Sequence, residues 1–239
     1  MDRSETLKTG FAAFGLIASF VAAAGAQANP ADVDKLDDVG VAGAVGTTGV
    51  GFHTTIPLRP NLNARLGMGY LGYTYSGRTK DLDYDLKLTA NTYDALLDWY
   101  PSKDSAFRLT AGLSYNGNKI DVHALPNASG AYTIQGHTYD AASAGKVNGK
   151  VDFNKVAPYL GIGWGRSSNK EKGWSFSTDI GVMLQGAPKT SLSSSGCTAP
   201  DSVCREFAND IARENAALRD EVNKFKVYPV LRVGISYKF

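Results

Sequence analysis

The sequence has 239 residues, a formal net charge of +2, 43% hydrophobic residues and 20% charged residues. Because the charges nearly balance and no long basic run occurs, the composition argues against nucleic acid as a partner. The 26 Gly, 12 Tyr and 10 Phe favour an all-β fold.

The first 28 residues have the order of a secretory signal peptide. Arg3 and Lys8 precede an apolar run from Phe11 to Ala26, and the small-residue motif Ala26-Gln27-Ala28 follows. We therefore expect a cleaved signal peptide over 1–28 and one mature domain over 29–239; an uncleaved anchor is the alternative. Beyond this run, no apolar stretch is long enough to predict a second membrane-spanning helix.

Alternation of apolar and polar residues, with a period of two, begins at Val39 and predicts antiparallel strands along most of the chain. A short strand over 39–46 turns tightly at Thr47-Thr48. Seven clearer strands follow, at 50–58, 62–70, 82–99, 107–116, 155–165, 174–186 and 225–239.

One of these strands changes its apolar face. The apolar residues occupy even positions from Leu82 to Ala90, but odd positions from Tyr93 to Trp99. Either a bulge near Asn91 or a strand that runs well above a membrane before entering it would produce the change.

The last strand carries the most informative pattern. Its odd positions are apolar from Phe225 to Phe239, and its even positions are mostly polar. The apolar face is longer than is usual for a soluble protein, and it ends in the aromatics of an interfacial girdle, with the order Ile235, Tyr237, Phe239. In this ending the chain resembles bacterial outer-membrane β-barrels, in which the terminal motif is recognised by the barrel-assembly machinery.

The resemblance is to the small OmpA/OmpX-type barrels, and it implies an all-β, eight-stranded antiparallel up-and-down transmembrane β-barrel, which we expect to be monomeric. Such barrels have an even number of strands, so the strand at 39–46 completes the count. They also have short periplasmic turns and long outer loops. The short links are 59–61, 101–105 and 167–172, and the long ones, 121–151 and 187–224, are expected outside the cell.

The longer outer loop is predicted to contain a helix over 204–224, capped by Ser202, with Phe207, Ile211, Leu218 and Val222 on one face. The helix either folds back over the barrel mouth or offers a surface to an extracellular partner or to lipopolysaccharide. Cys197 and Cys204 are expected to form a disulfide in this oxidising compartment. The other loop is expected to form a hairpin over 132–139.

If the apolar faces contact lipid, six charged residues point into the lumen: Arg65, Asp94, Asp98, Arg108, Asp179 and Arg232. An eight-stranded barrel has an interior that side chains just fill, so these charges must pair. Asp98 and Arg108 flank one turn, and Asp179 and Arg232 lie on neighbouring strands. We interpret the set as a structural ion-pair plug.

The pattern therefore predicts an integral protein of the bacterial outer membrane, surrounded by membrane lipid and lipopolysaccharide. Its predicted role is structural, or the presentation of the two outer loops to a partner. The alternative is a narrow channel for small solutes, since charged side chains in a lumen set selectivity. A lipid-acting enzyme is the least favoured reading, because His53 has no visible nucleophile and acid partner. No cofactor or metal motif is recognised.

Overall fold

The computed structural model describes residues 39–78, 83–102, 106–165 and 173–238. The predicted signal peptide over 1–28, the turn at 167–172, residues 103–105 of the turn at 101–105, and Phe239 lie outside these described residues.

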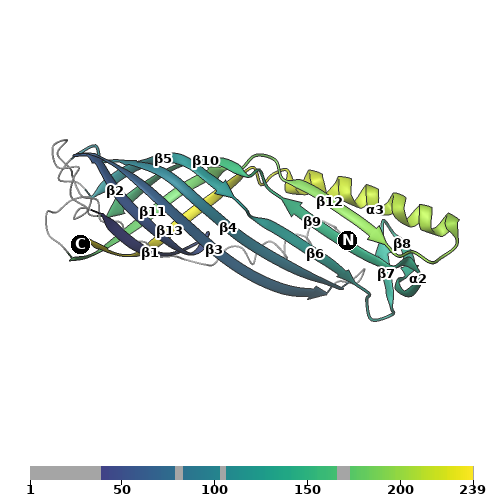
Figure 1. Ribbon diagram of the computed structural model, residues 1–239. Coiled ribbons are helices and arrows are strands. Elements are labelled where there is room, and N and C mark those ends of the chain that lie inside the picture. The colour runs from purple at the N-terminus through teal and green to yellow at the C-terminus, as the bar shows by residue number, and fades with distance from the viewer. Residues whose placement is uncertain (1–38, 79–82, 103–105, 166–172, 239) are drawn as a thin grey trace.

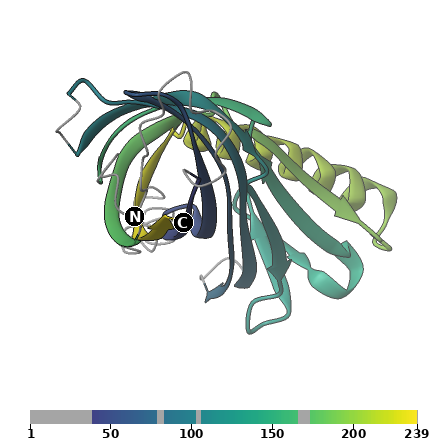
Figure 2. The same cartoon turned by 60° about the vertical axis from the view of Figure 1, so that its left-hand side comes forward.

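Eight antiparallel strands form a ring in the order of the chain (Figures 1 and 2). They are β1 (Gly40–Gly46), β2 (Gly49–Arg59), β3 (Leu62–Arg78), β4 (Asp83–Trp99), β5 (Phe107–Asn116), β10 (Val156–Gly165), β11 (Gly173–Leu184) and β13 (Val227–Lys238). The predicted strand at 39–46 is β1, which pairs along its whole length with β13. Its neighbour β2 follows after two residues and closes the ring.

The period-two pattern of the sequence separates the two faces of the ring. Along β4, for example, Thr92, Asp94, Leu96 and Asp98 are buried, whereas Tyr93, Leu97 and Trp99 are exposed. Aromatic side chains pair on the outside at both ends of the ring. We call the end of the ring at which β1 turns into β2 the upper end, and the end with the last residues of β13 the lower end. Tyr93 lies beside Tyr115, with ring centroids 6.0 Å apart, near the upper end. At the lower end, Phe107 lies beside Trp164 and Trp174 beside Tyr237.

The change of apolar face in β4 reflects a change of neighbour. The pairing of β4 with β3 is unbroken from Asp83 to Trp99, so the bulge alternative is wrong. From Thr92 onward β4 pairs with β5 in the ring, but before Ala90 it pairs with β6 (Lys119–Leu125). In that part of β4 the apolar residues, at even positions, lie on the inner face of the sheet. Their odd neighbours lie on the outer face, above the apolar exterior of the ring, and are polar.

Beyond the ring, the sheet continues as an open structure that we call the distal extension (Figure 1). It comprises the ends of β3 and β4 together with β6, β9 (Lys146–Asp152), β12 (Lys189–Ser195), the hairpin β7 (Ala131–Ile134) and β8 (His137–Asp140), the short α2 (Ala141–Ala144) and α3 (Asp201–Val222). The segments 121–151 and 187–224, expected to be loops, are thus largely sheet and helix. The expected hairpin at 132–139 is β7–β8, turning at Gln135-Gly136, both with positive φ.

Helix α3 packs on the hairpin and on the sheet through a small apolar core. Phe207 and Ile211 belong to one buried cluster with Val147, Tyr132 and Tyr139, and the Phe207 ring packs against both tyrosine rings. Val222 is buried as well, whereas Leu218 is only half-buried. The helix begins at Asp201 after an N-cap at Pro200, so the expectation of Ser202 as the cap is wrong. Among the described residues, no helix is both long enough and apolar enough to cross a membrane.

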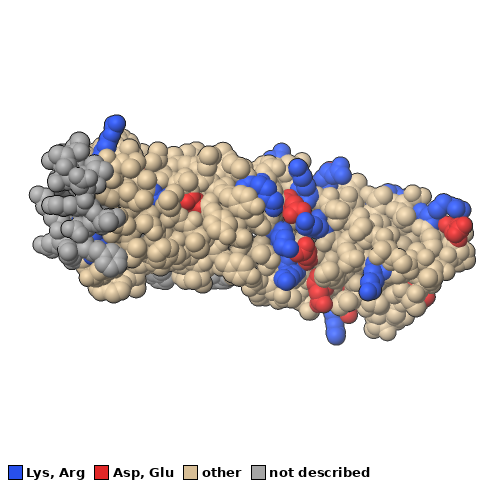
Figure 3. Space-filling model, viewed as in Figure 1, with Lys and Arg blue, Asp and Glu red and all other residues tan. Residues whose placement is uncertain are grey.

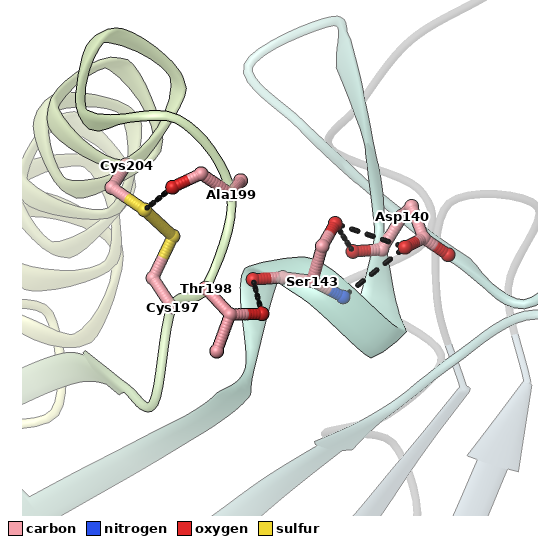
Figure 4. The surroundings of a disulfide bond; sticks show 6 residues. All are labelled: Asp140, Ser143, Cys197, Thr198, Ala199 and Cys204. Carbon is pink, nitrogen blue, oxygen red and sulfur yellow. Dashed lines mark hydrogen bonds between the residues drawn. A yellow bond between two sulfur atoms is a disulfide. The ribbon is translucent and has the colours of Figure 1, made fainter.

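A disulfide between Cys197 and Cys204 fastens the start of α3, as the sequence predicts (Figure 4). The same loop is attached to α2, since the Thr198 backbone N–H donates to the Ser143 carbonyl oxygen at 2.8 Å. Ser143 is held in turn by the Asp140 carboxylate, which accepts from its backbone N–H at 3.1 Å. The disulfide therefore ties the loop to the first turn of α3, and hydrogen bonds tie the same loop to α2 at the end of the hairpin.

Candidate functional site

The lower part of the ring interior is filled by four charged side chains, one each from β3, β4, β5 and β11. Arg65 donates to both carboxylate oxygens of Asp179, at 2.7 and 3.1 Å, and its Nη2 donates to Asp98 at 3.1 Å. Arg108 donates to Asp179 at 2.7 Å. All four side chains have no solvent exposure. Two positive and two negative charges therefore neutralise one another in a water-excluded site.

A second charged cluster lies next to the first. Arg232 of β13 contacts Asp94 of β4 at 2.6 Å, and its Nη1 lies 3.4 Å from Nε2 of His53. His53 Nε2 is also 3.7 Å from the Asp94 carboxylate. Hydroxyl groups add two hydrogen bonds, since Ser114 donates to Asp94 and Thr48 accepts from Nε of Arg232 at 3.1 Å. His53 thus belongs to an ion-pair cluster with Asp94 and Arg232.

Apolar and aromatic side chains fill the interior around these clusters. Leu96, Ala157, Tyr159, Met183 and Val230 form one buried group. The guanidinium carbon of Arg232 lies 5.9 Å from the centroid of the Tyr159 ring, within cation–π range. Tyr100 is buried at the lower end of the ring. Buried side chains therefore occupy the interior around the two ion-pair clusters.

The structure brings all six of the predicted lumen charges into these two clusters, and it forms one of the two pairs that the sequence suggests. Asp179 and Arg232 are register partners on β11 and β13, yet their ion pairs are with other residues. Asp98 and Arg108 do approach each other, at 3.7 Å. The sequence did not identify Thr110, Ser114 and Thr48 as hydrogen-bond partners of these charges, although the first two occupy inward positions of β5.

Of the expected assembly residues, Ile235 is exposed on the ring exterior and Tyr237 packs against Trp174. Phe239 lies outside the described residues. These positions leave the end of β13 at the opposite end of the molecule from α3 (Figure 1).

A third polar cluster lies in the distal extension, where Asp210 of α3 meets the hairpin. Its buried carboxylate accepts from the Tyr139 hydroxyl at 2.7 Å and lies 2.7 Å from Nδ1 of His137. Arg213 contacts the other carboxylate oxygen at 2.9 Å. The Tyr139 hydroxyl, together with His137, lowers the pKa of Asp210 below its ordinary value. Burial and the Asp210 contact raise the pKa of Tyr139. The cluster ties the helix to the hairpin.

Across the part of the chain that the structure describes, no group of three His, Cys, Asp or Glu is placed to hold a metal ion.

A strand ring that is apolar outside and charged within defines a membrane barrel with a polar, side-chain-filled interior. No family model and no curated protein matches the chain. Among solved structures, the crystal structure of CarO from Acinetobacter baumannii is similar. It is 25% identical and covers 84% of this chain and 97% of its own, with a TM-score of 0.52.

CarO2 from the same organism shares the fold, at 23% identity with 84% and 98% coverage and a TM-score of 0.52. CarO is an outer-membrane β-barrel protein. The ring of eight strands and the similarity to CarO together support an outer-membrane β-barrel, located in the outer membrane.

Proposed function

We propose that this protein is an eight-stranded, up-and-down transmembrane barrel that is closed by its own side chains and presents the distal extension outside the cell. Its role is then structural or that of a surface-interaction protein. The observation that carries the proposal is the fully buried set Arg65, Asp98, Arg108 and Asp179. A lumen whose charged groups are already paired with one another offers no polar path for a solute.

The exterior supports the placement in the bilayer. Exposed apolar side chains cover the ring between the upper aromatics, such as Tyr70 and Tyr93, and the lower ones, such as Trp99 and Trp164. Aromatic girdles of this kind mark the two interfaces of a membrane barrel. Charged side chains gather beyond the ring, over the distal extension (Figure 3). They include the surface ion pairs Lys119–Asp121 and Lys150–Asp152.

The distal extension is the surface that we propose for an extracellular partner or for the polar part of lipopolysaccharide. Its charges are mixed in sign, which suits a partner that is itself mixed in charge. The covalent crosslink and the Asp210 cluster hold this surface in one arrangement, so a partner would bind it without a large cost in ordering. During biogenesis, Ile235, Tyr237 and Phe239 would be recognised by the barrel-assembly machinery.

Conductance tests the closed lumen. Single-channel recording of the purified protein in planar bilayers is expected to show no reproducible open state. Conductance steps that change in size on Asp179→Ala or Arg232→Ala would support the narrow channel instead. For an enzyme of the membrane, a lipid modification that disappears with His53→Ala would be needed, and we expect none.

Surface labelling of intact cells tests the orientation. A short epitope inserted at the exposed turn Gln135-Gly136 is expected to bind antibody on intact cells. The same epitope inserted at Pro60, in the turn between β2 and β3, is expected to bind only after the outer membrane is permeabilised. The reverse result would refute presentation of the distal extension outside the cell.

A further inference from the structure

The wall of the ring is lower on one side, because the hairpin β1–β2 is short. Its turn, Thr47-Thr48, lies level with Leu231 of β13 and Gly69 of β3. Above this turn, residues 227–230 of β13 pair only with β11, and residues 71–78 of β3 pair only with β4. Figure 1 shows β3 and β4 continuing far beyond the end of this hairpin. Two strand edges therefore face each other across a notch in the wall.

The free edge of β13 is protected by two residues. The Thr47 hydroxyl accepts from the Leu231 backbone N–H at 3.1 Å and donates to the Pro229 carbonyl oxygen at 3.0 Å. Pro229 itself has no N–H to leave unpaired on this edge. Unpaired backbone groups are costly in hydrocarbon, so an edge with these two residues is suited to contact with lipid.

A cavity of about 210 Å³ lies directly above the Thr47 turn. It is lined mostly by apolar side chains, among them Leu88, Ala90, Ile120, Val151 and Phe153. Its polar lining side chains already have partners within the protein. Gln185 donates to the Phe225 carbonyl oxygen at 2.9 Å and accepts from Asn116 at 3.2 Å. Asn118 accepts from the Asn91 backbone N–H at 3.0 Å. Such a lining favours an apolar ligand, and a cavity of ~150 Å³ already holds a benzene-sized molecule.

The lining also shows where the cavity opens. It includes Tyr228, which points inward from β13, but also Val227 and Pro229, which are exposed on the outer face of the same strand. Three successive residues of one strand, with side chains on both of its faces, line one cavity where that cavity reaches the free edge of the strand. Val227 is 47% exposed and pairs with Leu184, which is also exposed on the apolar exterior. The mouth is therefore continuous with the surface that contacts the bilayer.

We propose that this cavity binds the end of an acyl chain from a lipid of the surrounding membrane, which enters sideways through the notch above Thr47-Thr48. A ligand from the aqueous side is disfavoured by the continuity of the mouth with the apolar exterior. The inference depends on the barrel lying in a bilayer, but not on whether its lumen conducts.

Quenching of tryptophan fluorescence by brominated lipid tests the proposal. The starting protein is the full chain with Trp99, Trp164 and Trp174 replaced by Phe, since all three are exposed on the ring. Phe153→Trp then reports on the cavity, and Leu113→Trp reports on the exterior. In vesicles of phosphatidylcholine brominated near the methyl end of its acyl chains, we expect both to be quenched, with Phe153→Trp reaching at least half the quenching of Leu113→Trp.

Filling the cavity provides the matched control. Ala90→Leu, or independently Ile120→Phe, is expected to remove most of the quenching of Phe153→Trp and to leave that of Leu113→Trp unchanged. Folding of each variant is checked by its shift on a gel before and after boiling. Quenching that persists in the filled variants would mean that bromine reaches residue 153 from outside, and would overturn the proposal.

Two other results would also overturn it. One is a quenched Leu113→Trp with an unquenched Phe153→Trp. The other is quenching of Phe153→Trp by brominated palmitate added in water, but not by brominated phospholipid. An unquenched Leu113→Trp has a different meaning, because it would show that the ring is not in the bilayer.

Discussion

Neutralising Asp179 is the sharpest test of the buried charge network. Asp179→Asn keeps the size of the side chain but removes the charge that binds Arg65 at 2.7 and 3.1 Å and Arg108 at 2.7 Å. Two buried guanidinium groups then share the single carboxylate of Asp98. Leaving a buried charge without its partner destabilises a protein by about 3–5 kcal/mol.

Urea unfolding of the protein folded into lipid vesicles gives the measurement. The emission of Trp99, Trp164 and Trp174 reports on the ring, because all three lie on its exterior. With a denaturant dependence of about 2 kcal/mol per molar urea, the midpoint is expected to fall by about 2 M. Asp121→Asn is the matched control, since its ion pair with Lys119 lies on the surface and is worth at most ~1 kcal/mol.

A charge-balanced double variant separates the lost ion pair from general disruption. Asp179→Asn combined with Arg108→Gln leaves one Arg and one Asp in the cluster, so part of the lost stability should return. The interaction between the two substitutions is expected to be between about 0.5 and 3 kcal/mol. If the Asp179→Asn protein folds fully and its free energy of unfolding is within ~1 kcal/mol of the parent's, the reasoning is refuted, because loss of a central charge from a buried cluster should destabilise the protein by more than that.

Three further predictions concern the distal extension and the β1–β2 turn. Replacing Cys197 and Cys204 by Ser removes a crosslink between residues seven apart, which is worth about 2.5 kcal/mol by chain entropy. Protease should therefore cut near α3 faster, while the heat-dependent gel shift of the barrel stays unchanged. Because the folded state lowers the pKa of Asp210, its contribution to stability is present at neutral pH and is lost as the pH falls from about 4 through the folded value. Protection of α3 from an acid protease should decline in that range, and Asp210→Asn, already weakened at neutral pH, should show a flatter profile. Gly49→Ala should lower the urea midpoint, since Gly49 has φ of +89° and an added Cβ would lie 2.1 Å from the Tyr70 carbonyl oxygen. The control is Gly43→Ala, because nothing lies within 4 Å of a Cβ added there.

The ring could be predicted from the sequence because its two environments differ so strongly. Lipid outside and packed charge inside impose a strict period of two, and this pattern places seven of the eight strands within two residues at each end. The exception is β3, which continues to Arg78, eight residues beyond the predicted end, as it leaves the ring. The same pattern identifies Arg65, Asp94, Asp98, Arg108, Asp179 and Arg232 as inward residues. Of their pairs it suggests only Asp98 with Arg108 correctly, because pairing depends on strand tilt and on side-chain reach across the ring. Thus Asp179 binds Arg65, which is 114 residues away in the sequence, and not its register partner Arg232.

The distal extension was harder to predict, because its sheet does not have the same surroundings throughout. Lys119–Leu125 and Lys146–Asp152 do alternate, but each is only seven residues long and its apolar face is made of few, mostly small residues. Such short segments were included in the predicted outer loop. The clearest signal was the change of apolar face in β4 near Asn91, which marks the point where the strand leaves the ring and joins the extension.

Of the eight ring strands, β1 has the least distinct alternation in the sequence, and its packing explains why. Its inward positions are Gly40, Ala42, Ala44 and Gly46, all small and all buried. They face the part of the interior that holds Arg232 and Tyr159, among the largest fully buried side chains of the described chain. A Cβ at Gly46 would lie 3.0 Å from Cγ of Arg232 and 2.6 Å from the Leu231 carbonyl oxygen. The small residues of β1 thus make room for the buried charged side chains, and the early turn at Thr47 makes room for the cavity above it. One short strand therefore sets the shape of both the filled interior and the notch in the wall.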